Sequence, residues 1–191
     1  MKDGSFSKTV SLPTPLSTST RSEVRSGAVS IASATEEAQL AFLKSLSNEA
    51  LRGLPYLFEF WAMPHQVPPD GDWRTWVILG GRGAGKTRAG AEWVRAEVEG
   101  SGPQDPGRSK DVALVGETLE QAREVMVFGP SGILACSPPD RRPVWEATKR
   151  RLVWPNGATA TLYSAFDHER LRGPQFDAAW VDVFGKVGID D

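Results

Sequence analysis

The chain has 191 residues, 22 Lys and Arg against 24 Asp and Glu, and a formal net charge of −2. This length predicts one globular domain and excludes a large enzyme with several catalytic domains. The near-neutral charge excludes a polybasic coat over the whole surface, although a local basic face remains compatible with it. The single cysteine, Cys136, excludes an internal disulfide and a zinc site made of cysteines.

The lone cysteine favours a cytoplasmic protein, and the lack of long apolar runs favours a soluble one. No apolar run approaches the roughly 20 residues needed to span a bilayer, and the first residues lack the continuous apolar core of a signal peptide. Residues 1–34 are rich in Ser and Thr, show no sustained periodicity and predict a flexible tail. At Thr35 a helix-start pattern and an apolar stripe begin, so we expect the folded part to span residues 35–191.

A strand, a glycine loop and a helix are expected in direct succession. Residues 75–79 (TWVIL) form a short apolar run that predicts a buried central strand. Glycines dominate residues 80–85, and residues 86–99 then show the periodicity of a helix that stops at Gly100.

Further strands and helices alternate along the rest of the chain. We expect a strand at residues 112–115, a helix from about Thr118 and a last strand at residues 178–181. Residues 150–163 predict a hairpin, because Asn156-Gly157 supplies the positive φ angles of a tight turn. This alternation predicts an α/β fold of the P-loop NTPase type, with a mainly parallel sheet flanked by helices.

Eight residues between the expected strand and helix match G-x-x-x-x-G-K-[ST] completely. They are Gly80, Gly81, Arg82, Gly83, Ala84, Gly85, Lys86 and Thr87. In such a loop backbone N–H groups converge on phosphate oxygens, Lys86 reaches the β and γ phosphates, and Thr87 coordinates Mg²⁺. The alternative is a glycine-rich turn that only caps a helix. Arg82 is either a second cation near the phosphates or a solvated arginine.

A Mg²⁺-dependent NTPase also needs a carboxylate beyond the loop. Asp182, at the end of the apolar run 178–181, is the candidate for this second metal ligand. The next residue is Val183, so a neighbouring carboxylate that would activate water is missing from the expected place. Upstream, Arg170 and Arg172 could reach a phosphate in their own subunit or a neighbour's, or could be solvated charges.

Three stretches together resemble the N-terminal ATPase domain of the large terminase subunit of tailed bacteriophages and phage-like gene transfer agents. They are HQVPPDGDWRTWVILGGRGAGKTRAGAEWVR, WPNGATATLYSA and LRGPQFDAAWVD, and the resemblance covers roughly residues 50–182. It implies a DNA-packaging ATPase that uses ATP and Mg²⁺ to thread double-stranded DNA into capsids. The implied partners are the portal protein, the small terminase subunit and further copies in a ring.

The resemblance also implies roles for single residues. Gln66 matches a glutamine that contacts adenine, Arg82 matches a recurring arginine of the loop, and Lys86 and Asp182 match the catalytic lysine and metal-binding aspartate. Arg172 resembles an arginine that acts on a neighbouring subunit's nucleotide, with Arg170 as the alternative.

The end of the chain departs from the family pattern. The resemblance implies a glutamate after Asp182, further strands and a nuclease domain, but Val183 follows and residues 183–191 do not resemble the expected continuation. We therefore expect a C-terminally truncated form, weak in hydrolysis, and leave open whether this chain is itself an enzyme. The alternatives are a non-enzymatic degraded or frameshifted remnant, or another P-loop protein such as a helicase-like ATPase or a small kinase.

Two groups of residues outside the motifs have functional and structural interpretations. Residues 141–151 hold five basic residues, which could contact DNA phosphates or form a solvated loop and hairpin edge. His65 and His168 lack metal-ligand spacing and are expected to be structural or solvated.

Overall fold

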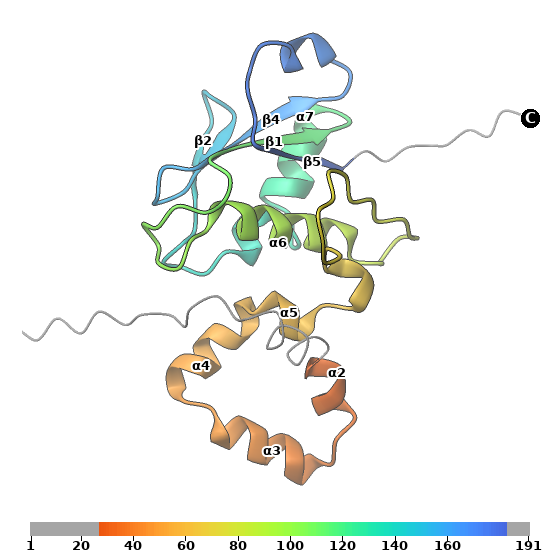
Figure 1. Cartoon of the computed structure of the whole chain (residues 1–191), viewed down its shortest axis with the longest axis vertical. Helices are drawn as coiled ribbons and strands as arrows, with labels where there is room; N and C mark the ends of the chain where they lie inside the picture. The colour runs from red at the N-terminus through yellow and green to blue at the C-terminus, as the bar shows by residue number, and fades with distance from the viewer. Residues whose placement is uncertain (1–26, 183–191) are drawn as a thin grey trace, which may run out of the picture.

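The computed structural model describes residues 27–182, and residues 1–26 and 183–191 lie outside the described part. The expected tail at residues 1–34 therefore falls largely outside it, and its described end forms the short helix α2 (Gly27–Ala32). From there the chain builds a string of short helices and then a sheet with helices packed on it (Figure 1).

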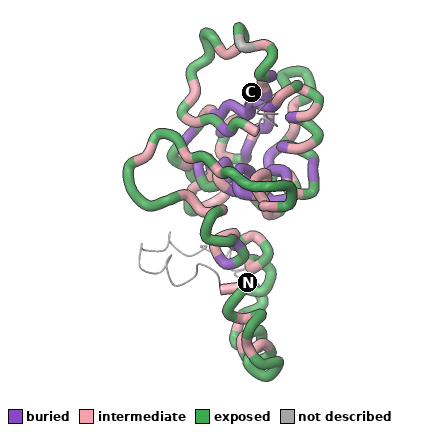
Figure 2. The backbone as a smooth tube through the Cα atoms, turned by 90° about the vertical axis from the view of Figure 1, so that its right-hand side faces the viewer, coloured by how far each residue is buried: buried purple, intermediate pink, exposed green. Residues whose placement is uncertain are grey.

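The short helices near the start carry few buried residues. They are α3 (Glu36–Ser45), α4 (Asn48–Gly53) and α5 (Phe58–Trp61), with the 3-10 turns η1 (Leu54–Tyr56) and η2 (Pro64–Gln66). The helix start predicted at Thr35 is confirmed, because Thr35 Oγ1 accepts a hydrogen bond from the Ala38 N–H at 3.3 Å. Figure 2 shows this part mostly exposed, while burial concentrates in the sheet region.

One mixed sheet of five strands forms the centre of the other region. Its strands are β1 (Asp111–Gly116), β2 (Val144–Glu146), β3 (Arg151–Val153), β4 (Thr159–Ser164) and β5 (Ala178–Asp182). In the order β2-β3-β4-β1-β5, β1 is parallel to β4 and β5, whereas β2, β3 and β4 pair antiparallel. The α/β class is confirmed, but the sheet is mixed rather than mainly parallel, because β4 brings its hairpin partner into the same sheet.

Helices α6 and α7 pack against this sheet, and α8 packs against α6. Their bounds are α6 (Lys86–Val98), α7 (Leu119–Ala122), which continues into the π-helical turn η3 (Arg123–Val127), and α8 (Ile133–Cys136). The 3-10 turn η4 (His168–Leu171) precedes β5. The helices predicted at residues 86–99 and from Thr118 are confirmed. The largest fully buried side chains of the shared core are Leu114, Met126, Ile133, Leu152 and Val94. No helix within residues 27–182 is long and apolar enough to cross a membrane.

The hairpin predicted at residues 150–163 is confirmed by the pairing of β3 with β4. Gly157 has a φ of 85°, and Asn156 Oδ1 accepts from the Ala158 N–H at 3.0 Å, as a tight turn requires. Asn156 Nδ2 also donates to Val98 O at 2.7 Å, which ties the turn to the end of α6.

The strand predicted at residues 75–79 is wrong. These residues form no strand, and Val77 and Leu79 are 66% and 88% exposed. The physical reason is the lack of a partner. β1 is already paired on both sides, and within residues 27–182 no strand pairs with segment 75–79 or with the outer edge of β5. An apolar run becomes a buried strand only where a neighbour completes its hydrogen bonds.

Candidate phosphate-binding site

The glycine loop of residues 80–87 connects segment 75–79 to α6. Gly83 and Gly85 have φ angles of 84° and 73°, in the left-handed region that favours glycine. Gly85 is the N-cap of α6, and the 13 residues of this helix direct the positive end of its dipole toward the loop. A Cβ on Gly85 would overlap the Gln66 amide, so a larger residue at this position would displace that side chain from the loop.

The Lys86 ammonium lies against the first residues of the loop. Its Nζ donates to Gly80 O at 2.7 Å and to Gly81 O at 2.8 Å. The lysine side chain is flexible and its ammonium has three donors, so phosphate oxygens can replace these carbonyl oxygens. The loop therefore places a cation beside the start of a helix, where an anion is favoured.

Thr87 and Asp182 meet across the space between α6 and β5. Thr87 Oγ1 donates to Asp182 Oδ2 at 3.2 Å, although the two residues lie 95 positions apart. Burial raises the pKa of Asp182, while the Thr87 hydrogen bond and the Lys86 charge oppose that shift. Within residues 27–182 no group of three His, Cys, Asp or Glu residues could hold a metal by itself. This hydroxyl and carboxylate are thus the oxygen pair that could share a metal with a ligand's phosphates.

The η2 turn brings two more side chains to the loop. Gln66 Nε2 donates to Ala84 O and Gly85 O at 3.4 and 3.3 Å, and its Oε1 accepts from the Met63 N–H at 2.8 Å. His65 Nε2 lies 3.1 Å from Ala84 O, a contact that requires a proton on this nitrogen. The structure therefore brings Gln66 to the loop, and it adds His65, whose contact no spacing in the sequence signalled.

A close approach of α6 to β5 positions Thr87 beside Asp182. Gly90 lies against Trp180, and a Cβ on Gly90 would overlap the indole ring. This contact was not predicted from the sequence, although an isolated glycine inside a helical pattern is a signal for such a close approach.

A buried ion network fixes the middle of the same helix. Arg95 pairs with Glu92 at 2.6 Å and with Glu99 at 2.9 Å, and it donates to Cys136 O at 2.8 Å. Burial raises the pKa of Glu92, while Arg95 and Arg88 oppose the shift. The spacing of these charges by three and four residues could have revealed the network, which holds α6 against α8.

One family model matches a stretch of the chain that includes both the glycine loop and β5. A family model described as terminase large subunit, T4likevirus-type, N-terminal, matches residues 77–187, more than half of the chain. The chain belongs to the terminase large subunit family. No curated protein and no solved structure matches it. The resemblance seen in the sequence is confirmed, and it supports a role in phage DNA packaging rather than that of a helicase-like ATPase or a kinase.

In this terminase domain, within residues 27–182, none of the candidate arginines makes a hydrogen bond or an ion pair with Thr87 or Asp182. Arg82 is exposed on the loop. Arg172 is 75% exposed and pairs with Glu169 at 3.1 Å, while Arg170 pairs with Asp167 at 2.7 Å. Among the described residues, neither Arg170 nor Arg172 hydrogen-bonds to the glycine loop. The structure thus brings together Gln66, Lys86, Thr87 and Asp182, and it leaves the arginines outside this group.

Proposed function

We propose that this terminase domain binds ATP with Mg²⁺ at residues 80–87, as the nucleotide-binding part of a DNA-packaging motor. The observation that carries the proposal is the 3.2 Å hydrogen bond from Thr87 Oγ1 to Asp182 Oδ2 beside the loop. Oxygen ligands of this kind suit Mg²⁺, and a helix start beside a glycine-rich loop favours phosphate.

The side chains present fit a magnesium nucleotide. Backbone N–H groups of the loop would bind phosphate oxygens, and Lys86 would exchange the Gly80 and Gly81 carbonyls for phosphate. Thr87 and Asp182 would hold the metal ion. Bound Mg-ATP supplies the phosphoanhydride bond whose hydrolysis would drive translocation of double-stranded DNA.

Residues around the loop would have supporting roles. Gln66 would contact adenine, since its amide already lies at the rim of the loop. Arg82 would add a second cation near the phosphates. Arg172 would act on the nucleotide of a neighbouring copy, because its guanidinium is exposed and, among the described residues, its ion pair is with Glu169, three positions before it. Arg170 is the alternative.

Hydrolysis by this chain would be weak. Val183 follows Asp182 at the place where the resemblance implies a glutamate that activates water. Asp182 itself would be occupied as a metal ligand, so we expect nucleotide binding without a matching rate of turnover.

The partners and the location are proposed from family membership. They are double-stranded DNA, the portal protein and the small terminase subunit, with several copies of the large subunit assembled on the portal in the cytoplasm of a host bacterium.

A non-enzymatic remnant is the second candidate. The exposed apolar residues Val77 and Leu79 support it, since a complete sheet would bury such a segment. A purified chain that melts without a cooperative transition would favour the remnant, whereas a cooperative melt together with ATP binding would favour the terminase motor domain.

Calorimetric titration of the full chain with ATP and Mg²⁺ tests the main proposal. We expect Lys86→Ala to weaken binding about tenfold or more, because a charge-assisted contact to phosphate is lost. Thr87→Ala should remove most of the dependence on Mg²⁺. The matched control is Lys44→Ala, which removes an exposed lysine of α3 and should leave the affinity unchanged.

Three results would count against the proposal. A parent chain that does not bind Mg-ATP, or that binds it equally well after Lys86→Ala, would remove the nucleotide site. Turnover of several ATP per second would contradict weak hydrolysis.

A further inference from the structure

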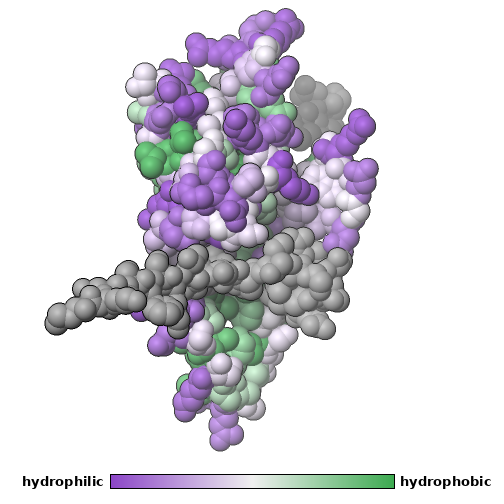
Figure 3. Space-filling view, turned by 60° about the vertical axis from the view of Figure 1, so that its left-hand side comes forward, coloured by the Kyte–Doolittle hydropathy of each residue, from purple (hydrophilic) through white to green (hydrophobic). Residues whose placement is uncertain are grey.

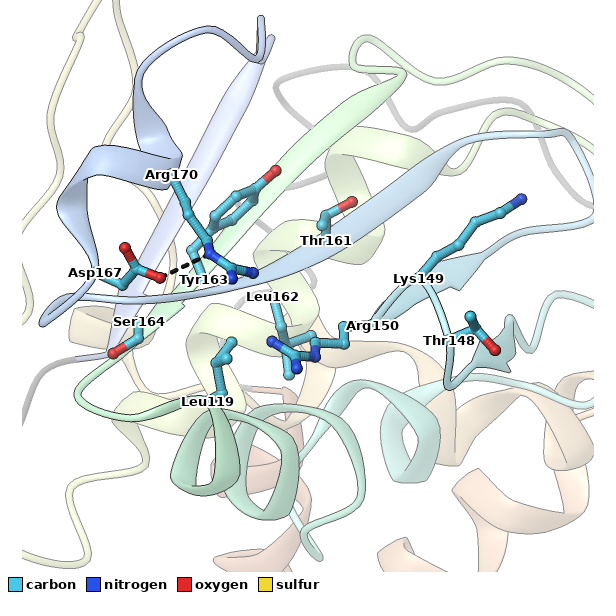
Figure 4. Close-up of a pocket in the computed structure, with 10 residues that line it drawn as sticks. All are labelled: Leu119, Thr148, Lys149, Arg150, Thr161, Leu162, Tyr163, Ser164, Asp167 and Arg170. Atoms are coloured by element: carbon cyan, nitrogen blue, oxygen red, sulfur yellow. Dashed lines mark ion pairs between the residues drawn. The ribbon is translucent and has the colours of Figure 1, made fainter.

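An open cavity of about 350 Å³ lies apart from the glycine loop. Its walls come from the turn before β3 (residues 148–150), from β4 (residues 161–164) and from the η4 region, and Leu119 of α7 lies at its base (Figure 4). It shares no residue with the loop or with Asp182. The cavity therefore needs a separate explanation.

Positive charge dominates the lining of this cavity. The lining includes three cationic side chains, Lys149, Arg150 and Arg170, and a single carboxylate, Asp167, which pairs with Arg170 at 2.7 Å. Lys149 Nζ lies 3.6 Å from Glu146 Oε2, and Glu146 is not part of the lining. Within the part of the chain that the structure describes, the Arg150 guanidinium makes no ion pair or hydrogen bond.

The two guanidinium groups converge. In Figure 4, Arg150 and Arg170 come from different segments and point toward the same space above Leu119. Like charges in one cavity repel each other, and an anion between them would remove the repulsion and satisfy their donors.

The backbone of Arg150 is held in an uncommon conformation. Its φ is 53°, the only positive value at a non-glycine residue among residues 27–182. Two hydrogen bonds keep it there, from the Leu162 N–H to Arg150 O at 2.9 Å and from the Arg150 N–H to Ala147 O at 3.2 Å. Such strain concentrates at functional sites, and here the strained residue carries the guanidinium that makes no ion pair or side-chain hydrogen bond within residues 27–182.

We propose that this cavity binds a phosphate of a DNA strand, with Arg150 as the main contact and Arg170 beside it. A guanidinium fork matches two phosphate oxygens. The inference rests on the proposed function in that DNA is the cargo of the motor. The one aromatic residue of the lining, Tyr163, packs edge-on against Phe176 rather than presenting a free ring to a base.

The structure also separates this site from the rest of the basic segment 141–151. Arg141 is buried and donates to Gly100 O and Ser101 O, both at 2.6 Å. Arg151 pairs with Glu146 at 2.7 Å. These arginines therefore stabilise the fold, and only residues 149–150 of the segment contribute cations to the cavity.

Fluorescence anisotropy with a labelled duplex of about 20 base pairs, without nucleotide and over a series of salt concentrations, tests the proposal. Arg150→Gly removes the cation and also suits the positive φ, so the variant should fold. We expect its dissociation constant to rise about tenfold and the slope of log affinity against log salt to fall by about 0.9. Arg170→Gln should raise the dissociation constant about threefold.

The matched control is Arg52→Ala, which removes an exposed arginine of α4, on the helical part away from the sheet. We expect its affinity for the duplex to stay within twofold of the parent, and all variants should melt at the temperature of the parent.

Four results would overturn the inference. The first is a parent chain that does not bind the duplex, and the second is an Arg150→Gly variant that binds it as well as the parent does. The third is an Arg52→Ala variant whose affinity for the duplex falls as much as that of Arg150→Gly. The fourth is displacement of the duplex by AMP or inorganic phosphate, which would assign the cavity to a small anion. ATP binding measured on the same samples separates the two proposals. If the chain binds ATP and Arg150→Gly leaves DNA binding unchanged, only the proposal for this cavity is overturned. If the parent chain binds DNA but not ATP, only the proposed nucleotide site is overturned.

Discussion

On the side of β3 and β4 the sheet is closed by packing, whereas beyond β5 apolar residues remain in solvent. Leu152 and Trp154 are buried in the hairpin, but Val77 and Leu79, just before the glycine loop, are largely exposed. The open side also carries Asp182, whose pKa is raised by burial beside Thr87. The β3–β4 hairpin thus contributes buried apolar side chains to the core, whereas segment 75–79, just before the candidate nucleotide site, leaves its apolar side chains exposed, and substitutions should separate the two.

Leucine truncations on the two sides give the largest contrast. Leu152→Ala should reduce the free energy of unfolding by about 3 kcal/mol, because it leaves a cavity at a fully buried position. Leu79→Ala should change it by less than about 0.5 kcal/mol, since this side chain is 88% exposed. Urea titrations followed by circular dichroism measure both values. Equal destabilisation would show that segment 75–79 is packed in solution.

Labelling of Cys136 measures independently how Leu152→Ala and Leu79→Ala differ in their effect on stability. This thiol is buried in the core, and burial raises its pKa to about 12, so it should react only when the chain opens. Leu152→Ala should speed its reaction with a maleimide by about a hundredfold, in line with about 3 kcal/mol. Leu79→Ala should leave the rate unchanged. Fast labelling of the parent chain would contradict the closed core.

A smaller effect is expected where the two sides meet. Gly90→Ala would place a methyl group against Trp180 and push β5 away from α6. We expect a loss of about 2 kcal/mol in stability, as for other overpacked cores, and a loss of Mg²⁺-dependent ATP binding because Thr87 and Asp182 separate. The variant Gly90→Ala with Trp180→Leu restores space and should recover part of both. An unchanged affinity for Mg-ATP in Gly90→Ala would show that the contact does not position the site.

The part of the site that could be predicted depends on local signals. The glycine loop, the start of α6 and the hairpin turn at Asn156-Gly157 each follow from neighbouring residues that supply positive φ angles or a helix cap. The position of Asp182 followed from the end of an apolar run, and the structure brings its carboxylate to the Thr87 hydroxyl, while their roles as metal ligands stay a prediction.

The features that could not be predicted depend on contacts between residues far apart in the sequence. Segment 75–79 has the composition of a strand, but pairing is decided by which strands lie beside β1, a property that no local pattern contains. The mixed sheet arose in the same way, from the antiparallel hairpin beside β4. The convergence of Arg150 with Arg170 requires the folded turn before β3, so residues 141–151 indicated basic character without indicating which cations share a cavity.

The smallest expected effect concerns the carboxylate on the open side. Because folding raises the pKa of Asp182, its protonated form favours the folded state below the ordinary pKa, and this contribution is lost as the pH rises through the raised value. At pH 7 without metal, the partly buried carboxylate therefore opposes folding. Asp182→Asn removes this cost and should raise the Tm by about 2 °C, whereas near pH 4 the two chains should melt at nearly the same temperature.

Added Mg-ATP should reverse that order. The parent chain should gain stability from the nucleotide by mass action, and Asp182→Asn should gain much less because one metal ligand is gone. Differential scanning fluorimetry at both pH values, with and without Mg-ATP, measures the four combinations. A lower Tm for Asp182→Asn at pH 7 without metal would mean that the hydrogen bond from Thr87 outweighs the burial of the charge, and the open side of the sheet would then contribute to stability as well as to binding.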